Sequence, residues 1–326
     1  MSNPEMSVVL VTPDSYRRLQ NTITSLARQT VSLAPEIVIV SPRRLPDPQD
    51  PCWARFSAVK LVPAGPYLKL AYPKAVAVSH CTAAIVAFGE DHCFPEPDWA
   101  ENLIRCHGDG WAAVAPALRN GNPGAVSWAD CLLNFGPHVS PVAPGSVLTT
   151  PWHNTSYKRD LLNAYGERLE HMLEAEIRIH SDLARNGRQL CLAANTVASH
   201  INISCWRSFL LAQLLGGRLC GSARAEAAGW SGARRLLHAS MLPLIPYWRA
   251  PQVIADAKRT MRDGWNPAFL LACICGLAAS ALGEVSGYVF GAGSMGRRRI
   301  TYEYDRNRHV RSADRKYLPA SGERLT

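Results

Sequence analysis

The sequence has no two cysteines at the C-x-x-C spacing of zinc and dithiol motifs, although it contains 10 cysteines. The closest two, Cys273 and Cys275, lie inside an apolar run, where packing in a core is the expected role. The first residues, MSNPEMSVVLVTPDS, lack the basic head and apolar stretch of a secretory signal. The sequence therefore gives no indication of zinc, and we expect a cytosolic protein with reduced, mostly buried thiols.

Lys and Arg outnumber the acidic residues in the rear half of the chain, and this imbalance produces most of the net charge of +9. The stretch RRRITYEYDRNRHVRSADRK carries many more Arg and Lys than acids. A basic half favours contact with nucleic acid or with an anionic membrane surface. The aromatic and basic interleaving of single-strand binders is weak here, so we expect the membrane and not nucleic acid as partner.

The 326 residues, 47% of them hydrophobic, are enough for one large folded domain with an extension. Residues 1–202 alternate between short β-branched runs, such as VVLVT and EIVIVSP, and stretches with helical spacing. Strand–helix–strand units of this length imply parallel pairs with right-handed crossovers. The pattern predicts an α/β, Rossmann-like domain with a mainly parallel sheet flanked by helices.

Beyond residue 202 the composition changes. Residues 203–296 combine Trp, Leu and Phe with interspersed Arg, which is typical of helices lying in a membrane interface. The uncharged run NPAFLLACICGLAASALG is, at roughly 17–18 residues, at the lower limit for a spanning helix, so a spanning helix and a buried or re-entrant hairpin both remain open. Residues 297–326 show little periodicity, and we expect a basic, mobile tail.

The polar stretch FGEDHCFPEPDW directly follows the apolar run AAIVAF. Ligands of open parallel sheets bind outside the carboxyl ends of the strands, and acids there can hold a divalent cation on a diphosphate. Asp91 is thus a candidate metal ligand, and so is His92, because Mn²⁺ tolerates imidazole. Glu90 is open between nucleoside, metal and solvent. For all three residues the alternative is a solvated turn.

The segment EHMLEAEIRIHSDLARNG predicts one amphipathic helix that ends at Gly187. Glu176, Ile179 and Leu183 fall on one face of it, so the carboxylate of Glu176 should point toward the sheet. Glu174 is the neighbouring acid.

In order and spacing, these stretches resemble the family 2 glycosyltransferases of the GT-A fold, in a bacterial subgroup with a membrane-associated C-terminal extension. The resemblance covers about residues 6–202. It rests on SVVLVTPDSYRRLQNTITSLARQT, EIVIVS, the triplet Glu90–His92 before PEPDW, WHNTSYKRDLL, EAEIRIHSDLARNG and VASH.

The resemblance implies a role for several residues. Glu176 would be the catalytic base, with Glu174 as the alternative. Mn²⁺ or Mg²⁺ would be held by Asp91, His92 and His200, although His200 could also be a core histidine with satisfied hydrogen bonds. The nucleotide-sugar donor would be bound by Thr12, Pro13, Asp14, Ser41, Glu90, Asp91 and Asn154, and for Asn154 the alternative is capping and packing.

The implied activity is inverting transfer of a sugar from a nucleotide-diphosphate donor to a hydroxyl of a carbohydrate or lipid-linked acceptor, at the cytoplasmic face of the membrane. A nucleotidyltransferase is disfavoured because VTPDSY lacks the glycine of a triphosphate loop. A non-catalytic, membrane-bound nucleotide-sugar-binding or assembly protein is the other alternative. It is favoured by three departures from the family pattern: Ser41 and His92 stand where Asp is usual, and Ala175-Glu176 replaces a Glu-Asp pair.

Overall fold

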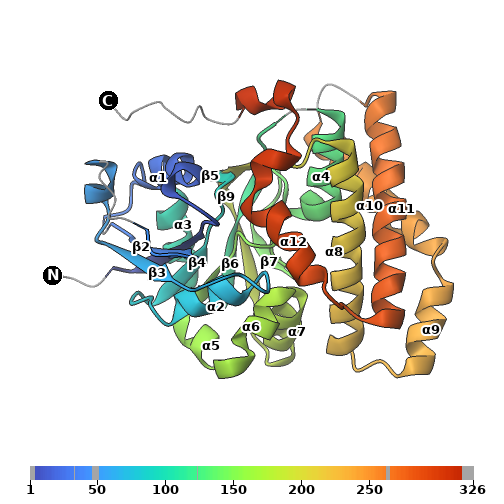
Figure 1. Ribbon diagram of the computed structural model, residues 1–326, viewed down its shortest axis with the longest axis horizontal. Coiled ribbons are helices and arrows are strands. Elements are labelled where there is room, and N and C mark those ends of the chain that lie inside the picture. Colours follow the sequence, from blue (N-terminus) through green and yellow to red (C-terminus); the bar gives the residue numbers. More distant parts are fainter. Residues whose placement is uncertain (1–3, 33, 46–50, 123, 262–264, 318–326) are drawn as a thin grey trace.

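The computed structural model describes residues 4–32, 34–45, 51–122, 124–261 and 265–317. A curled sheet flanked by helices forms one side of the molecule, and a bundle of long helices stands beside it (Figure 1). The N-terminal 200 residues therefore form the α/β layer structure that the sequence predicts, and the long helices follow it in the chain.

Nine strands form one sheet in the order β3-β2-β1-β4-β8-β6-β9-β5, with β7 paired to β9. They are β1 (Met6–Val11), β2 (Glu36–Ser41), β3 (Ala58–Pro63), β4 (Ile85–Phe88), β5 (Cys93–Pro95), β6 (Ala113–Asn120), β7 (Gly145–Val147), β8 (Ser156–Lys158) and β9 (Leu190–His200). The pairs joining β3, β2, β1 and β4 are parallel, as is β6 with β9, whereas β8, β5 and β7 pair antiparallel. The sheet is therefore mixed beyond β4. The three antiparallel strands have three residues each, too few to leave a periodic signal in the sequence.

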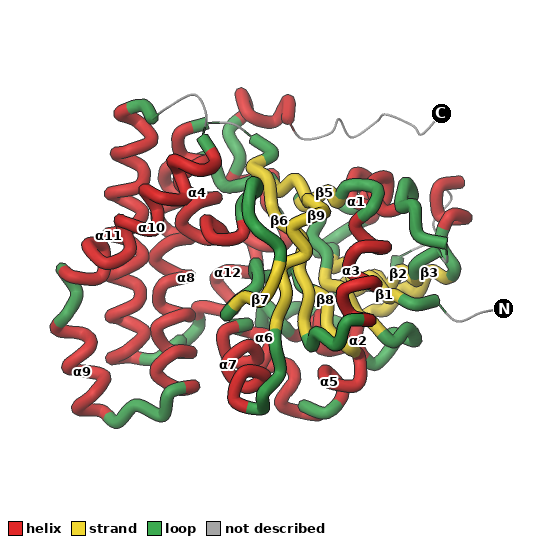
Figure 2. Tube along the Cα trace, turned by 180° about the vertical axis from the view of Figure 1, so that it is seen from behind, coloured by secondary structure: helices red, strands yellow, loops and turns green. Residues whose placement is uncertain are grey.

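Helices cover both faces of the sheet (Figure 2). One face carries α1 (Gln20–Leu26) and α3 (Trp99–Gly108), and the other carries α2 (Tyr72–Val78), α5 (Arg159–Asn163), α6 (Leu169–Glu174) and α7 (Ile177–Arg185). Ile37 and Ile39 of β2 pack toward α1, and Val38 and Val40 toward α2, all with no solvent exposure. A strand buried on both faces reads as a continuous apolar run, and this explains the sequence EIVIV.

The helix predicted over residues 170–187 is broken. Ala175 is extended, with φ −141° and ψ 104°, and it separates α6 from α7. The carboxylates of Glu174 and Glu176 consequently leave the chain in different directions, although only one residue lies between them.

The bundle consists of α8 (Trp206–Ala227), α9 (Gly232–Ser240), α10 (Leu244–Thr260) and α11 (Pro267–Phe290), with α4 (Ala125–Phe135) between it and the sheet. Glycines bring α8 and α11 together: a Cβ on Gly217 would lie 2.2 Å from the carbonyl oxygen of Ser280, and one on Gly283 would lie 2.1 Å from that of Leu214. Among the described residues, α11 is the helix long and apolar enough to cross a membrane, and half of its most apolar stretch is buried in the protein. The stretch is therefore one continuous, partly buried helix and not a hairpin, and its crossing of a membrane stays a prediction.

The expectation of a mobile tail from residue 297 is wrong for residues 297–317. The chain returns from the bundle to the sheet as α12 (Met295–Tyr304), drawn in red in Figure 1, followed by 3-10 turns at Arg306–His309 and Ser312–Tyr317. Tyr304 is buried and donates to the carbonyl oxygen of Leu70 at 2.6 Å, and Asp305 pairs with Arg18. Residues 318–326 lie outside the described residues. The segment carries little amphipathic periodicity because its buried anchors are mostly polar and contact several different elements.

Candidate active site

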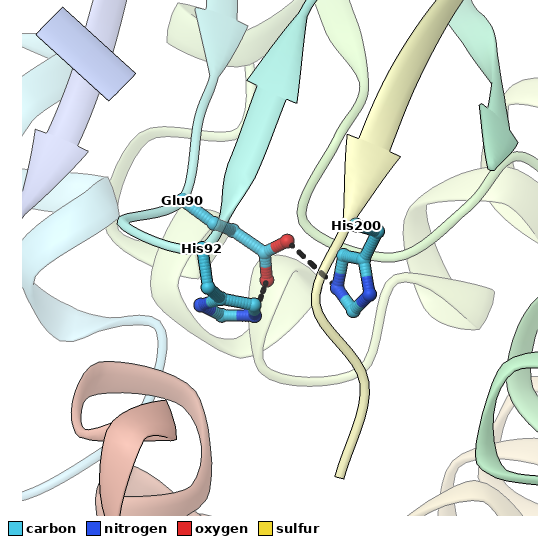
Figure 3. A group of neighbouring side chains, drawn as sticks. All are labelled: Glu90, His92 and His200. Carbon is cyan, nitrogen blue, oxygen red and sulfur yellow. Dashed lines mark ion pairs between the residues drawn. The ribbon is translucent and has the colours of Figure 1, made fainter. Parts of the chain in front are cut away.

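Three buried side chains meet where β4, β5 and β9 end or begin (Figure 3). Glu90 follows β4, His92 precedes β5, and His200 is the last residue of β9. Cys93 of β5 is the antiparallel partner of His200, and this pairing brings the two loops together. One ligand atom from each of Glu90, His92 and His200 lies within 4.8 Å of the others.

The geometry of this cluster fits a divalent cation. Nε2 of His92 lies 3.6 Å and Nε2 of His200 lies 3.3 Å from the carboxylate of Glu90. Both nitrogens are buried and have no hydrogen-bond partner among the described residues. Burial lowers the pKa of His200, so a lone pair is available for a metal. One carboxylate and two imidazoles suit Mn²⁺ better than Mg²⁺, which prefers oxygen ligands.

Each imidazole is oriented by a neighbour through its other nitrogen. Nδ1 of His92 lies 2.6 Å from Oδ1 of Asp91, and Nδ1 of His200 lies 2.8 Å from Oδ1 of Asn202. Such partners fix the tautomer that leaves Nε2 free to ligate. The placement differs from the expected ligand set: Asp91 contacts Nδ1 of His92, and Glu90 supplies the carboxylate of the cluster.

Glu176 directly precedes the first residue of α7 and is 1% exposed. Its Oε1 accepts the backbone N–H of His153 at 2.8 Å, and its Oε2 accepts the hydroxyl of Tyr157 at 3.3 Å. Burial raises the pKa of Glu176 to about 7, against the charge of Lys74 and these two hydrogen bonds. Ile179 and Leu183 are buried with it, so the carboxylate points inward as its spacing predicts.

Residues 153 and 154 connect Glu176 with the cluster. The backbone of His153 holds Glu176, and the amide of Asn154 donates to Oε2 of Glu90 at 2.6 Å. Asn154 therefore contacts the cluster directly, beyond the capping and packing role that was its alternative. Consecutive residues thus hold the Glu176 carboxylate, whose pKa burial raises to about 7, and the cluster of Glu90, His92 and His200.

The sequence patterns did not predict a role for Lys74, His153 or Glu303. Lys74 of α2 is 3% exposed, and its Nζ lies 2.5 Å from Nδ1 of His153. His153 has a left-handed backbone, φ 66°, and burial lowers its pKa to about 3. Glu303 of α12 lies 4.0 Å from Nε2 of His153. Burial opposes its ionisation, yet Arg299, His153 and Arg306 lower the pKa of Glu303 to about 2. For Lys74 a signal existed, because it is the one charge in the apolar run AYPKAVAV.

Glu174 lies apart from Glu176. Its Oε2 accepts the backbone N–H of Ala71 at 2.8 Å, at the start of α2, and the first turn of α12 at Gly296 closes over it. This contact gives Glu174 a structural partner, and the structure places Glu176 and not Glu174 against residues 153 and 157.

The expected donor-binding residues lie at the ends of β1 and β2. Thr12 is buried, and its hydroxyl donates a hydrogen bond to the carbonyl oxygen of Ser15 at 2.8 Å. The hydroxyl of Ser41 donates to the carbonyl oxygen of Arg43 at 2.5 Å. Pro13 is half-buried, and Asp14 is exposed and paired with Arg18 at 2.8 Å. These residues share the carboxyl edge of the sheet, but in the part of the chain that the structure describes no hydrogen bond or ion pair joins them to Glu90 or Glu176.

The chain matches solved structures of glycosyltransferases. The mannosyltransferase PcManGT of Pyrobaculum calidifontis, solved with GDP-Man and Mn²⁺, is 16% identical and aligns with 92% of this chain and 88% of its own, at a TM-score of 0.53. GalNAc-T7, solved with UDP, GalNAc and Mn²⁺, is 14% identical over 60% of this chain, with a TM-score of 0.47. TarS of S. aureus is 12% identical over 86% of this chain, with a TM-score of 0.48.

The chain spans 43% of the GalNAc-T7 chain and 55% of the TarS chain. No sequence-family profile matches the chain, and no curated protein matches it in sequence. At these identities the likeness concerns the fold. The mixed, curled sheet and its flanking helices, aligned with PcManGT over nearly the whole chain, are therefore a GT-A-type fold.

Proposed function

We propose that this protein transfers a sugar, with inversion, from a nucleotide-diphosphate-sugar donor to a hydroxyl of a carbohydrate or lipid-linked acceptor. The observation that carries the proposal is the buried cluster of Glu90, His92 and His200 at the strand ends of a GT-A-type fold. PcManGT was solved with a nucleotide sugar and Mn²⁺, and this chain offers a ligand set suited to the same ion.

Glu90, His92 and His200 would hold the cation, with Asp91 and Asn202 orienting the rings. A divalent cation in this place neutralises negative charge on the leaving diphosphate. Thr12, Pro13, Asp14 and Ser41 would line the nucleoside side of the donor site, because they follow β1 and β2 at the same edge of the sheet.

Glu176 would be the base of a single displacement. As the acceptor oxygen bonds to the anomeric carbon and the bond to the diphosphate oxygen breaks, the hydroxyl proton passes to the Glu176 carboxylate. A pKa of about 7 suits this task, since the group can both take and release a proton near neutral pH. The N–H of His153 and the hydroxyl of Tyr157 fix its orientation.

The helical bundle would hold the enzyme at the cytoplasmic face of the membrane. Supporting this, α9 exposes Leu236 and Leu237 by 62% and 64%, next to Arg234 and Arg235. Exposed apolar residues beside arginines are typical of helices in contact with anionic lipid.

The alternative is a non-catalytic protein that binds nucleotide sugars. It is favoured by Ser41, because this residue has no carboxylate to offer at the end of β2. Its hydroxyl donates a hydrogen bond to the carbonyl oxygen of Arg43. Both functions require donor binding, and only the first requires turnover.

Thermal-shift measurements against a panel of UDP- and GDP-sugars, with and without Mn²⁺, test the donor site. We expect stabilisation by at least one donor that depends on Mn²⁺ and is lost in the double variant His92→Ala/His200→Ala. Release of nucleoside diphosphate, and the anomeric configuration of the product by NMR, then test transfer. Mn²⁺-dependent binding with no release would favour the non-catalytic protein, and no donor binding in the whole panel would reject both.

A further inference from the structure

A cavity of about 520 Å³ lies between the sheet and the helical bundle. Its walls come from α4, α8, α10, α11 and α12, and its inner end from the loop at residues 149–153. The volume is typical of a small-molecule site. His153 and Ile177 line it, and these residues are the backbone partner and the chain neighbour of Glu176.

Four buried nitrogens in residues that line this cavity have no hydrogen-bond partner among the described residues. They are Nδ1 of His138, Nε2 of His153, Nε of Arg299 and Nε of Arg306. Buried polar atoms are nearly always paired in native proteins, so each of these nitrogens is a candidate donor or acceptor for a water or a ligand. With Lys74 as the donor to Nδ1 of His153, the proton of the neutral ring lies on Nε2, which would then donate to an acceptor on a ligand.

The formal charges in the cavity wall balance, because it contains four carboxylates and four guanidinium groups: Asp130, Asp256, Glu284, Glu303, Arg224, Arg249, Arg299 and Arg306. Glu303 pairs with Arg299 at 2.5 Å and with Arg306 at 3.3 Å, and Glu284 pairs with Arg224. A wall with paired charges has no net attraction for an ionic ligand, whereas its donors and carboxylates match hydroxyl groups, which both donate and accept.

Two tryptophans add apolar surface to the lining of the cavity. Trp152 lies next to His153 and has the guanidinium of Arg299 over its ring at 5.4 Å. Trp248 of α10 is 56% exposed and also lines the cavity. Aromatic rings with a few placed polar groups are what a site needs to bind and orient a small ligand.

We propose that this cavity binds the glycosyl acceptor, and that the acceptor presented there is an uncharged saccharide whose hydroxyls pair with His153 and the Arg299–Glu303–Arg306 group. The C-terminal segment thereby supplies one wall of the acceptor site. This inference rests on the proposed function, because only a transferase has an acceptor. The binding of a saccharide in the cavity, however, can be measured without donor, metal or turnover.

The experiment titrates the full-length protein with methyl glycosides of glucose, galactose, mannose and N-acetylglucosamine, followed by tryptophan fluorescence. We expect saturable quenching by at least one glycoside. Ala212→Phe, which places a ring in the cavity, should weaken this binding roughly tenfold or more. The matched control is Leu211→Phe, one residue away on α8 and 40% exposed outside the cavity, which should bind as the wild type does.

A second pair covers the case in which Ala212→Phe does not fold. Trp248→Ala removes an exposed lining ring and should weaken binding, while Tyr247→Ala, 73% exposed and not part of the lining, should not. Equal binding within both pairs, or no saturable quenching by any glycoside, overturns the inference. Loss of sugar transfer with retained, Ala212-sensitive saccharide binding would instead count against the proposed function alone.

Discussion

Oδ1 of Asp91 lies 2.6 Å from Nδ1 of His92, so the acid orients the histidine that follows it. The ring then turns Nε2 toward Glu90, at 3.6 Å from its carboxylate. Within the triplet Glu90-Asp91-His92, the first and third residues face the proposed cation and the second supports the third. A histidine can therefore stand at the third position, where the resembling family usually has a carboxylate, because its neighbour fixes the ring.

Changing Asp91 should weaken cation binding without removing a ligand. We expect Asp91→Ala to lower Mn²⁺ affinity by roughly ten- to a hundredfold, as loss of an orienting partner does, and Asp91→Asn to lower it less. His92→Ala should lower it further. Isothermal titration with Mn²⁺ measures this series. Glu96→Gln, an acid nearby that pairs with Arg119, is the control and should bind as the wild type does. An unchanged affinity in Asp91→Ala would contradict the orienting role.

The activity should rise with pH up to about 7 and then level off. Burial raises the pKa of Glu176 to about 7, and a base acts only when deprotonated, so kcat/KM should fall about tenfold per pH unit below that value. Glu176→Gln can keep the hydrogen bond from His153 and should lose about 10²- to 10⁴-fold in rate, together with this pH dependence. Glu174→Gln should retain the wild-type profile. If Glu174→Gln loses the rate and the pH dependence while Glu176→Gln keeps the wild-type profile, Glu174 is the base.

The same shift predicts how stability depends on pH. The pKa of Glu176 is about 7 in the folded protein and 4.5 as the ordinary value, so folding favours the protonated form. This contribution is fully present below pH 4.5 and is lost as pH rises through 7, by up to about 3 kcal/mol. Denaturant unfolding at pH 5 and pH 8 should therefore show Glu176→Gln gaining stability over the wild type at the higher pH. An equal difference at both pH values would indicate that Glu176 is not shifted.

The sequence was sufficient for the parts of the site that follow strands. Runs such as EIVIV and AAIVAF are unambiguous because the strands are buried on both faces, and the polar residues after them fall at the carboxyl edge by topology. It was insufficient for Lys74, His153 and Glu303, which come from two helices and a loop far apart in the chain. A lone Lys in an apolar helix shows that something pairs with it, but its partner is decided by tertiary packing. The break at Ala175 was equally hidden, because residues 170–187 have good helical spacing throughout.

The α8–α11 contact offers a matched pair of adjacent glycines. A Cβ on Gly217 would lie 2.2 Å from the backbone oxygen of Ser280, whereas one on Gly216 meets the side chain of Arg299 at an ordinary 3.6 Å. Gly217→Ala should force the helices apart at a cost of about 1–3 kcal/mol. Gly216→Ala should be neutral or should stabilise the helix by up to about 1 kcal/mol. Denaturant unfolding compares them, and shifts of the same sign and size would show that the close approach is absent in solution.

Membrane association is the last prediction, and α9 is the element to change. Leu236 and Leu237 are exposed beside Arg234 and Arg235, so both apolar insertion and attraction to anionic lipid should contribute. In flotation with phosphatidylserine-containing vesicles, Leu236→Ser/Leu237→Ser should weaken binding at least tenfold, since each leucine side chain contributes about 1.5–3 kcal/mol when fully buried. Arg234→Gln/Arg235→Gln should lower binding to these vesicles by about 1 kcal/mol per charge and leave binding to neutral vesicles unchanged. Leu148→Ser is the control, because Leu148 is 90% exposed but follows β7 of the sheet and does not belong to α9. Vesicle binding that survives both double variants, or that falls equally in Leu148→Ser, would remove α9 from the proposed membrane face.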